Sequence, residues 1–136
     1  MNQPIMEFES TEQAQECLKE WQGRLFLNDW IIKVMFEDLN DTDRFGEVEI
    51  ASAIKCAVIR ISPKSEYNSS TLVKYCAEKT IVHELCHIVL DYVDFQGNKP
   101  IEAVVFEEIQ HQKVEQMAKS LIMAKYDLPF DWFKNF

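Results

Sequence analysis

Apolar residues near the start of the chain recur at helical spacing. Between Ser10 and about Gly23 they lie three or four residues apart, which predicts a helix. Ser10 with Gln13 three residues later forms a capping-box pattern, and Gly23 is a stop signal. The apolar positions of this predicted helix are Ala14, Cys17, Leu18 and Trp21.

Three short segments with strand-like composition follow. Trp30–Phe36 is rich in β-branched and aromatic residues, and Gly46–Ala53 alternates valine and isoleucine with glutamates. The third strand, Cys56–Ile61, is closed by Ser62-Pro63. The acidic stretch Glu37–Asp43 is predicted as a surface turn and the polar stretch Lys64–Ser70 as a loop.

The second half of the chain is predicted to be helical. One helix runs from about Thr71 to Val93, and the pattern allows a break near Ala77–Lys79. After the turn Gly97–Pro100, a last helix runs from Pro100 to about Tyr126. The expected fold is therefore an α+β domain with a small, mainly antiparallel three-stranded sheet. Its 136 residues suit one domain, 1–136.

Charge and cysteine usage restrict the partners and the compartment. The formal net charge is −9, with 23 acidic against 14 basic residues, so no nucleic-acid or membrane partner is expected. The N-terminus has neither the basic region nor the apolar run of a signal peptide, and no stretch is apolar enough to span a bilayer. The four scattered cysteines are expected to be reduced thiols, which indicates a cytoplasmic protein.

The sequence His83-Glu84-Leu85-Cys86-His87 lies inside the second predicted helix. Positions four apart share a helix face, so both imidazoles can point at one Zn2+ ion, and the Glu84 carboxylate flanks the same site. Zinc lowers the pKa of its bound water, and a nearby carboxylate can take the proton as that water attacks a carbonyl. The motif therefore predicts a zinc site with Glu84 as general base in peptide-bond hydrolysis.

Apolar neighbours strengthen this interpretation. Ile81 and Val82 precede the motif and Ile88, Val89 and Leu90 follow it, so the helix is expected to be buried on nearly all sides. Burying two histidines and a glutamate without a shared partner would cost several kcal/mol, a cost that a metal ion offsets.

The third zinc ligand is sought on the last helix. Glu108, His111 and Glu115 lie on one face, which Ala118 and Ile122 continue toward the core. Glu115 is the preferred ligand, with His111 and then Glu108 as rivals, whereas Glu107 is expected to be solvated. Outer-shell or substrate-facing roles are expected for His111, Glu108 and Tyr92. Tyr92, His111 and Tyr126 are also candidates to polarise the substrate carbonyl.

Two segments resemble a known family. Thr80–Val89 resembles the extended motif of zincin metallopeptidases, and Glu115–Ile122 is similar to the segment that follows the third-ligand glutamate in ImmA/IrrE-like enzymes. These are minimal gluzincins of bacteria, phages and mobile elements. The resemblance spans about Trp30 to Ile122 and implies that His83, His87 and Glu115 bind zinc and that Glu84 is catalytic.

Three functions remain open. The leading one is a cytoplasmic zinc peptidase acting on a protein or peptide. A catalytically silent zincin-fold binding module is the second, and Glu84 argues against it because a structural zinc site needs no such carboxylate. An SprT-like DNA-associated protease is the third: His111 would supply its third histidine, but the net charge of −9 argues against DNA.

Two further segments carry weaker expectations. Val58–Ile61 is either an ordinary sheet strand or, by analogy with zincins, an edge strand that pairs with an extended substrate. The aromatic tail Leu128–Phe136 is expected to pack back on the core.

Overall fold

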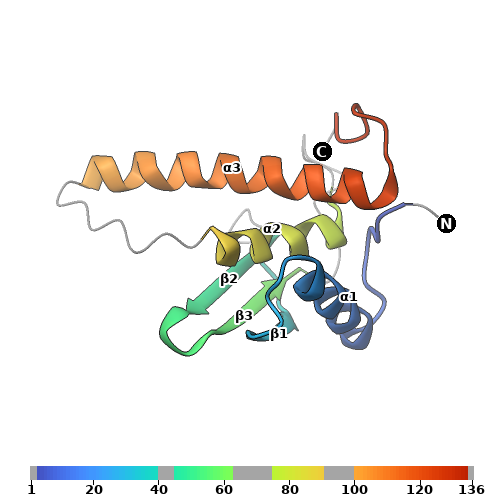
Figure 1. Ribbon diagram of the computed structural model, residues 1–136, viewed down its shortest axis with the longest axis horizontal. Coiled ribbons are helices and arrows are strands. Elements are labelled where there is room, and N and C mark those ends of the chain that lie inside the picture. Colours follow the sequence, from blue (N-terminus) through green and yellow to red (C-terminus); the bar gives the residue numbers. More distant parts are fainter. Residues whose placement is uncertain (1–2, 40–44, 63–74, 91–99, 135–136) are drawn as a thin grey trace.

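The computed structural model describes residues 3–39, 45–62, 75–90 and 100–134 (Figure 1). Its elements confirm the α+β class, with an N-terminal helix, three strands and two further helices. In chain order they are α1 (Thr11–Arg24), β1 (Ile31–Phe36), β2 (Gly46–Ala51), the short 3-10 helix η2 (Ser52–Ile54), β3 (Cys56–Ile61), α2 (Ala77–Val89) and α3 (Pro100–Tyr126). Among the described helices, none combines the length and the apolarity that crossing a bilayer requires.

The sheet is mixed, whereas a mainly antiparallel sheet was expected. Its strand order is β1-β3-β2, with β2 antiparallel and β1 parallel to β3. Only η2 and Lys55, in a left-handed conformation at φ 52°, connect β2 to β3, so these strands pair as a hairpin and β1 takes the other side of β3. The interpretation of Val58–Ile61 as a substrate-pairing edge is therefore wrong, because β3 is the central strand.

Helix α1 begins as the sequence predicts. The Ser10 hydroxyl accepts a hydrogen bond from Gln13 N over 3.1 Å, and Gln13 Oε1 accepts one from Glu9 N. The helix ends at Arg24, one residue beyond the predicted stop. Its predicted apolar positions are all buried.

Helix α2 begins later than predicted. Residues 71–74 lie outside the described part of the chain, and Cys76 is extended and makes no side-chain cap. Instead, Ala77 N donates to Met6 O over 2.9 Å and Glu78 N donates to Ile5 O over 3.0 Å. The N-terminal segment thus supplies the acceptors that the first turn of α2 needs.

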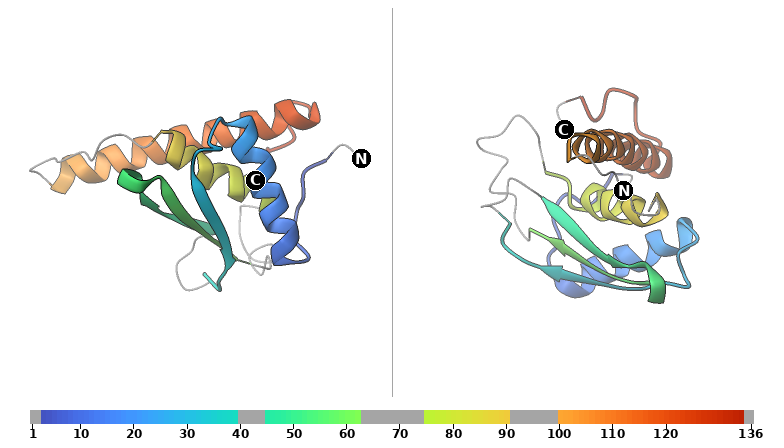
Figure 2. Two further views of the ribbon diagram at one scale, coloured as in Figure 1. Left: turned by 60° about the horizontal axis from the view of Figure 1, so that its bottom comes forward. Right: turned by 90° about the vertical axis from the view of Figure 1, so that its left-hand side faces the viewer.

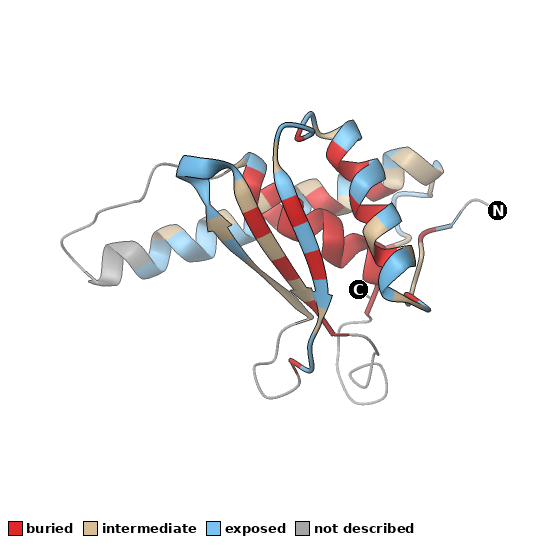
Figure 3. Ribbon diagram, turned by 90° about the horizontal axis from the view of Figure 1, so that it is seen from below, coloured by how far each residue is buried: buried red, intermediate tan, exposed pale blue. Residues whose placement is uncertain are grey.

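Helix α2 lies between the sheet and α3, with α1 beside it (Figures 1 and 2). This position explains why nearly every residue of α2 is buried, charged ones included. On α3, Val114, Ala118 and Ile122 are fully buried against this layer, which confirms the predicted core-facing side of that helix. The N-terminal half of α3 extends past α2, and most of its residues between 104 and 113 are exposed (Figure 3).

A buried carboxylate fixes the N-terminal end of α2. Glu78 is 0% exposed, and its Oε1 accepts hydrogen bonds from Ile5 N over 2.9 Å and from the Tyr126 hydroxyl over 2.6 Å. Its Oε2 accepts from Trp21 Nε1 and from Lys125 Nζ, both over 2.8 Å. One side chain therefore joins α1, α2, α3 and the N-terminal segment.

The cysteines and the tail agree in large part with what the sequence predicts. All four cysteines are free thiols, and Cys56 alone among them is not buried. In the tail, Phe133 is buried in the core and Trp132 packs against it, while Phe130 is 90% exposed. Residues 135–136 lie outside the described part.

Candidate metal centre

Three histidines meet where α2 and α3 pack side by side (Figure 1). His83 and His87 lie one turn apart on α2, and α3 contributes His111. The ring centroids are 5.0 Å apart for His83 and His87, 4.7 Å for His83 and His111, and 5.9 Å for His87 and His111. One ligand nitrogen from each ring lies within 4.8 Å of the other two. Within the described residues, this is the group of side chains that could hold a metal ion.

The protonation state of His87 suits metal binding. Burial, reinforced by the neighbouring His83 and His111, lowers the pKa of His87 to about 4. His87 is therefore neutral at pH 7, with a lone pair available on its ring. Its imidazole is ready for a metal ion without first losing a proton.

Glu84 lies at the edge of this cluster. It is buried on α2, and its Oε1 is 4.0 Å from His83 Nε2. That distance is longer than a hydrogen bond and leaves the carboxylate beside a nitrogen that can bind a metal. A water molecule on such a metal would lie within reach of the carboxylate.

Glu115 contacts the other nitrogen of His83. Its Oε1 is 3.2 Å from His83 Nδ1, and its two carboxylate oxygens are 3.2 and 3.0 Å from Lys79 Nζ. Burial alone would raise the pKa of Glu115, but the hydrogen bond from His83 and the charge of Lys79 lower it to about 2. An ionised carboxylate can only accept, so His83 Nδ1 is the donor in this contact, and in a neutral His83 ring the lone pair lies on Nε2.

The structure brings together most of the residues singled out in the sequence. His83, Glu84, His87 and His111 share one site, and Glu115 lies behind His83. Glu108 is exposed on α3, as is Glu107, which the sequence analysis expected to be solvated. Tyr92 lies outside the described residues, and the Tyr126 hydroxyl is bonded to Glu78.

Lys79 is the residue that sequence analysis missed. Only 4% of its side chain is exposed, and its ammonium is paired with Glu115. Lys79 lies four positions before His83, so the helical spacing that relates the two histidines also places this lysine on their face. That spacing was the available signal, but the predicted break near Ala77–Lys79 obscured it.

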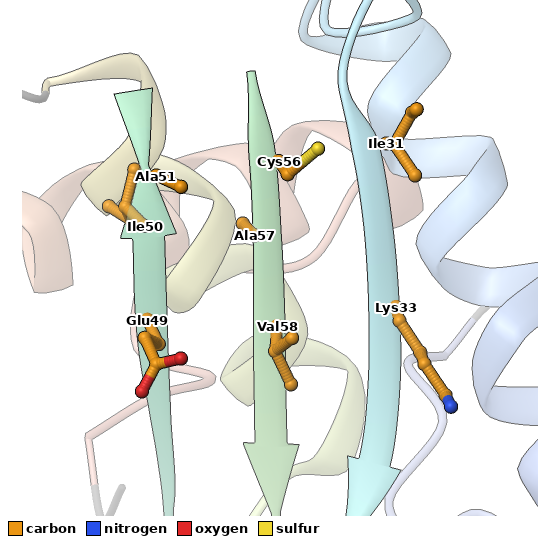
Figure 4. Close-up of a pocket in the computed structure, with 8 residues that line it drawn as sticks. All are labelled: Ile31, Lys33, Glu49, Ile50, Ala51, Cys56, Ala57 and Val58. Carbon is orange, nitrogen blue, oxygen red and sulfur yellow. The ribbon is translucent and has the colours of Figure 1, made fainter. Parts of the chain in front are cut away.

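A shallow groove lies elsewhere, on the face of the sheet opposite α2 (Figure 4). Its outward-pointing residues include Ile31 and Val58, with Lys33 and Glu49 on the two outer strands. The sheet separates this groove from the histidine cluster, so it does not form part of the candidate metal centre.

Comparison with known proteins adds no relative. No protein-family model, curated protein or solved structure matches the chain at a significant level. The function must therefore be argued from the site.

Proposed function

We propose that this protein is a zinc-dependent peptidase in which His83, His87 and His111 hold the metal. The observation that supports it most is the convergence of these three rings with the buried Glu84 carboxylate. Three histidines from two helices within 4.8 Å form the donor set of a catalytic zinc site that keeps one position for water or substrate.

The residues present fit zinc in number and chemistry. Neutral imidazoles suit zinc, and a tetrahedral site with Zn–N distances of 2.0–2.1 Å separates its ligand atoms by about 3.4 Å. The observed limit of 4.8 Å requires only a modest approach of the rings. His111 is the exposed member of the cluster, so its side chain has room for that adjustment.

Glu84 supplies the general base in this proposal. When bound, zinc lowers the pKa of water and polarises a carbonyl group. Glu84, adjacent to His83 Nε2, accepts the proton of the attacking water and delivers it to the leaving amine. Its buried position keeps the carboxylate within the site.

The contacts of Glu115 favour His111 as the third ligand. Glu115 already binds Lys79 and the Nδ1 atom of His83, whereas His111 contributes a nitrogen to the metal-sized cluster. A carboxylate that accepts from a ligating histidine is a common partner in zinc sites. In this proposal Glu115 orients a ligand and does not itself bind the ion.

Among the described strands, β2 offers an extended substrate an edge of the sheet. This strand ends the sheet and borders α2, which carries the histidines. Gly46 brings the strand close, since a Cβ atom there would lie 2.6 Å from Thr80 Cγ2. We therefore assign substrate pairing to β2, with main-chain hydrogen bonds that add the peptide as a further strand.

The two other functions are weaker. A three-histidine set is also what an SprT-like protease would show, but the net charge of −9 offers little attraction for DNA. A silent binding module would not need a buried glutamate beside the metal ligands.

Metal analysis and activity assays test the proposal together. Purified protein should carry about one zinc per chain, and His83→Ala, His87→Ala and His111→Ala should each lose it. Glu84→Gln should keep zinc but lose hydrolysis of a denatured protein substrate such as casein. Full zinc in all three histidine variants would remove the site, and unchanged hydrolysis by Glu84→Gln would remove the general base.

A further inference from the structure

A lysine ammonium is buried directly behind the histidine cluster. Lys79 Nζ makes two contacts of 3.2 and 3.0 Å with the carboxylate oxygens of Glu115, and 4% of the lysine side chain is exposed. Burying an ammonium group is costly, so a paired lysine here is expected either to stabilise the α2–α3 contact or to serve the site.

The geometry links this ammonium to one nitrogen of one histidine. Glu115 Oε1 contacts both Lys79 Nζ and His83 Nδ1, and it lies 3.2 Å from each. As the acceptor in this contact, the carboxylate requires the proton of His83 on Nδ1, and the other ring nitrogen, Nε2, lies 4.0 Å from Glu84 Oε1. Lys79 holds the carboxylate in turn, because contacts to both oxygens restrict its rotation.

We infer that Lys79 and Glu115 form a positioning pair that fixes the ring orientation and tautomer of His83 and thereby sets the metal affinity of the site. This inference rests on the proposed metal centre. Even with the lysine in place, 29% of the Glu115 side chain is exposed, so without Lys79 the carboxylate can turn toward solvent. His83 would then lose the acceptor that selects its tautomer.

A second lysine–glutamate pair provides a matched control. Lys125 Nζ contacts Glu78 Oε2 over 2.8 Å and, like Lys79 with Glu115, joins α3 to α2. The Lys125 pair lies at the start of α2, and within the described part of the chain the hydrogen bonds of the Lys125 ammonium go to Glu78 and Glu20 rather than to a histidine. Removing either lysine affects the packing of the two helices, but only Lys79 is connected to His83.

The test is a double-mutant cycle on zinc affinity, measured by competition with a chromophoric chelator. Glu115→Gln should weaken zinc binding by about 10–100-fold, the usual effect of losing an outer-shell partner. Lys79→Met should weaken it in the same direction, and adding Lys79→Met to Glu115→Gln should change affinity little further, because the lysine acts through the carboxylate. Lys125→Met should lower stability but leave zinc affinity unchanged.

Cobalt substitution separates positioning from ligation. Glu115→Gln and Lys79→Met should keep the intense visible absorption of a four-coordinate cobalt site, whereas His111→Ala should lose it. The inference is overturned if both single variants bind zinc with wild-type affinity. It is also overturned if Lys79→Met weakens zinc binding equally with and without Glu115. Neither outcome affects the proposed metal centre. Complete zinc loss in Glu115→Ala together with retention in His111→Ala would make Glu115 a ligand and also overturn the inference. A wild-type protein that binds no zinc would remove the proposed function and this inference with it.

Discussion

The Tyr126 hydroxyl donates a 2.6 Å hydrogen bond to Glu78 Oε1 and so joins the end of α3 to the first turn of α2. Glu78→Ala should lower the free energy of unfolding by about 3–5 kcal/mol, since it takes the acceptor from the Tyr126 hydroxyl, Trp21 Nε1 and Ile5 N and leaves the half-buried Lys125 ammonium with the exposed Glu20. Urea denaturation of the metal-free protein measures this. As a control, Glu20→Ala, which removes the exposed acceptor of Lys125, should cost less than about 1 kcal/mol.

Stability should depend on pH through the same carboxylate. Burial alone would raise the pKa of Glu78, but hydrogen bonds from Lys125, Tyr126, Ile5 and Trp21 lower it below its ordinary 4.5. The folded protein then binds this proton less readily than the unfolded chain, so the contribution is full above about pH 4.5 and is lost as the pH falls further.

Urea denaturation between pH 6 and pH 3 should show this loss as a fall in the free energy of unfolding. The slope of that free energy against pH should be smaller in Glu78→Gln. Glu115, whose pKa is about 2, keeps part of the slope in that variant. Equal slopes in the wild-type protein and Glu78→Gln would show that the Glu78 pKa is not lowered on folding.

Gly46 on β2 should not tolerate a side chain. An added Cβ would lie 2.6 Å from Thr80 Cγ2 and 3.2 Å from Arg60 O, so Gly46→Ala should lower stability by about 1–3 kcal/mol. Thermal denaturation measures the loss. Thr80→Ser removes the clashing methyl group and keeps the hydroxyl that donates to Cys76 O, so the double variant should recover part of it. If the double variant recovers no stability, the contact of the added Cβ with the Arg60 carbonyl oxygen is the one that destabilises Gly46→Ala.

Removing the metal should destabilise the protein. Zinc at about 100 times its Kd should raise the free energy of unfolding by about 2.7 kcal/mol, because the ion binds the folded chain. A chelator should reverse the effect in a thermal melt. Glu107→Ala, at an exposed position of α3, should respond to zinc as the wild-type protein does, whereas His111→Ala should not respond. A zinc response in His111→Ala equal to that of the wild-type protein would contradict its role as a ligand.

Local sequence patterns predicted the individual helices and strands better than the way in which they pack and pair. The Ser10 cap and the alternation in Gly46–Ala51 depend on neighbouring residues, and both elements begin where expected. The start of α2 depends on the carbonyls of Ile5 and Met6, which come from more than seventy positions earlier in the sequence and leave no local signal. The central place of β3 likewise depends on its pairing with β1, although β2 lies between these two strands in the sequence.

The candidate site divides in the same way. His83, Glu84 and His87 follow from spacing within one helix. The distinct placements of His111 and Glu115 depend on how α3 is rotated and shifted against α2, which one helix alone does not encode. Ligation by Glu115 was predicted from its place on the core-facing side of α3 and from a family resemblance, and it stays a prediction, which the affinity measurements above test.

The Glu78 contacts also have a consequence for the order of folding. Its donors Ile5, Trp21 and Lys125 are 73, 57 and 47 positions away along the chain, so this anchor forms only after distant segments have met. A nascent chain that ends just after His111 carries every proposed ligand but lacks Lys125. In a growing chain, metal binding and the final packing of α2 can therefore occur at different times. An ion bound early would restrict the conformational search by which Ile5, Trp21 and Lys125 reach Glu78.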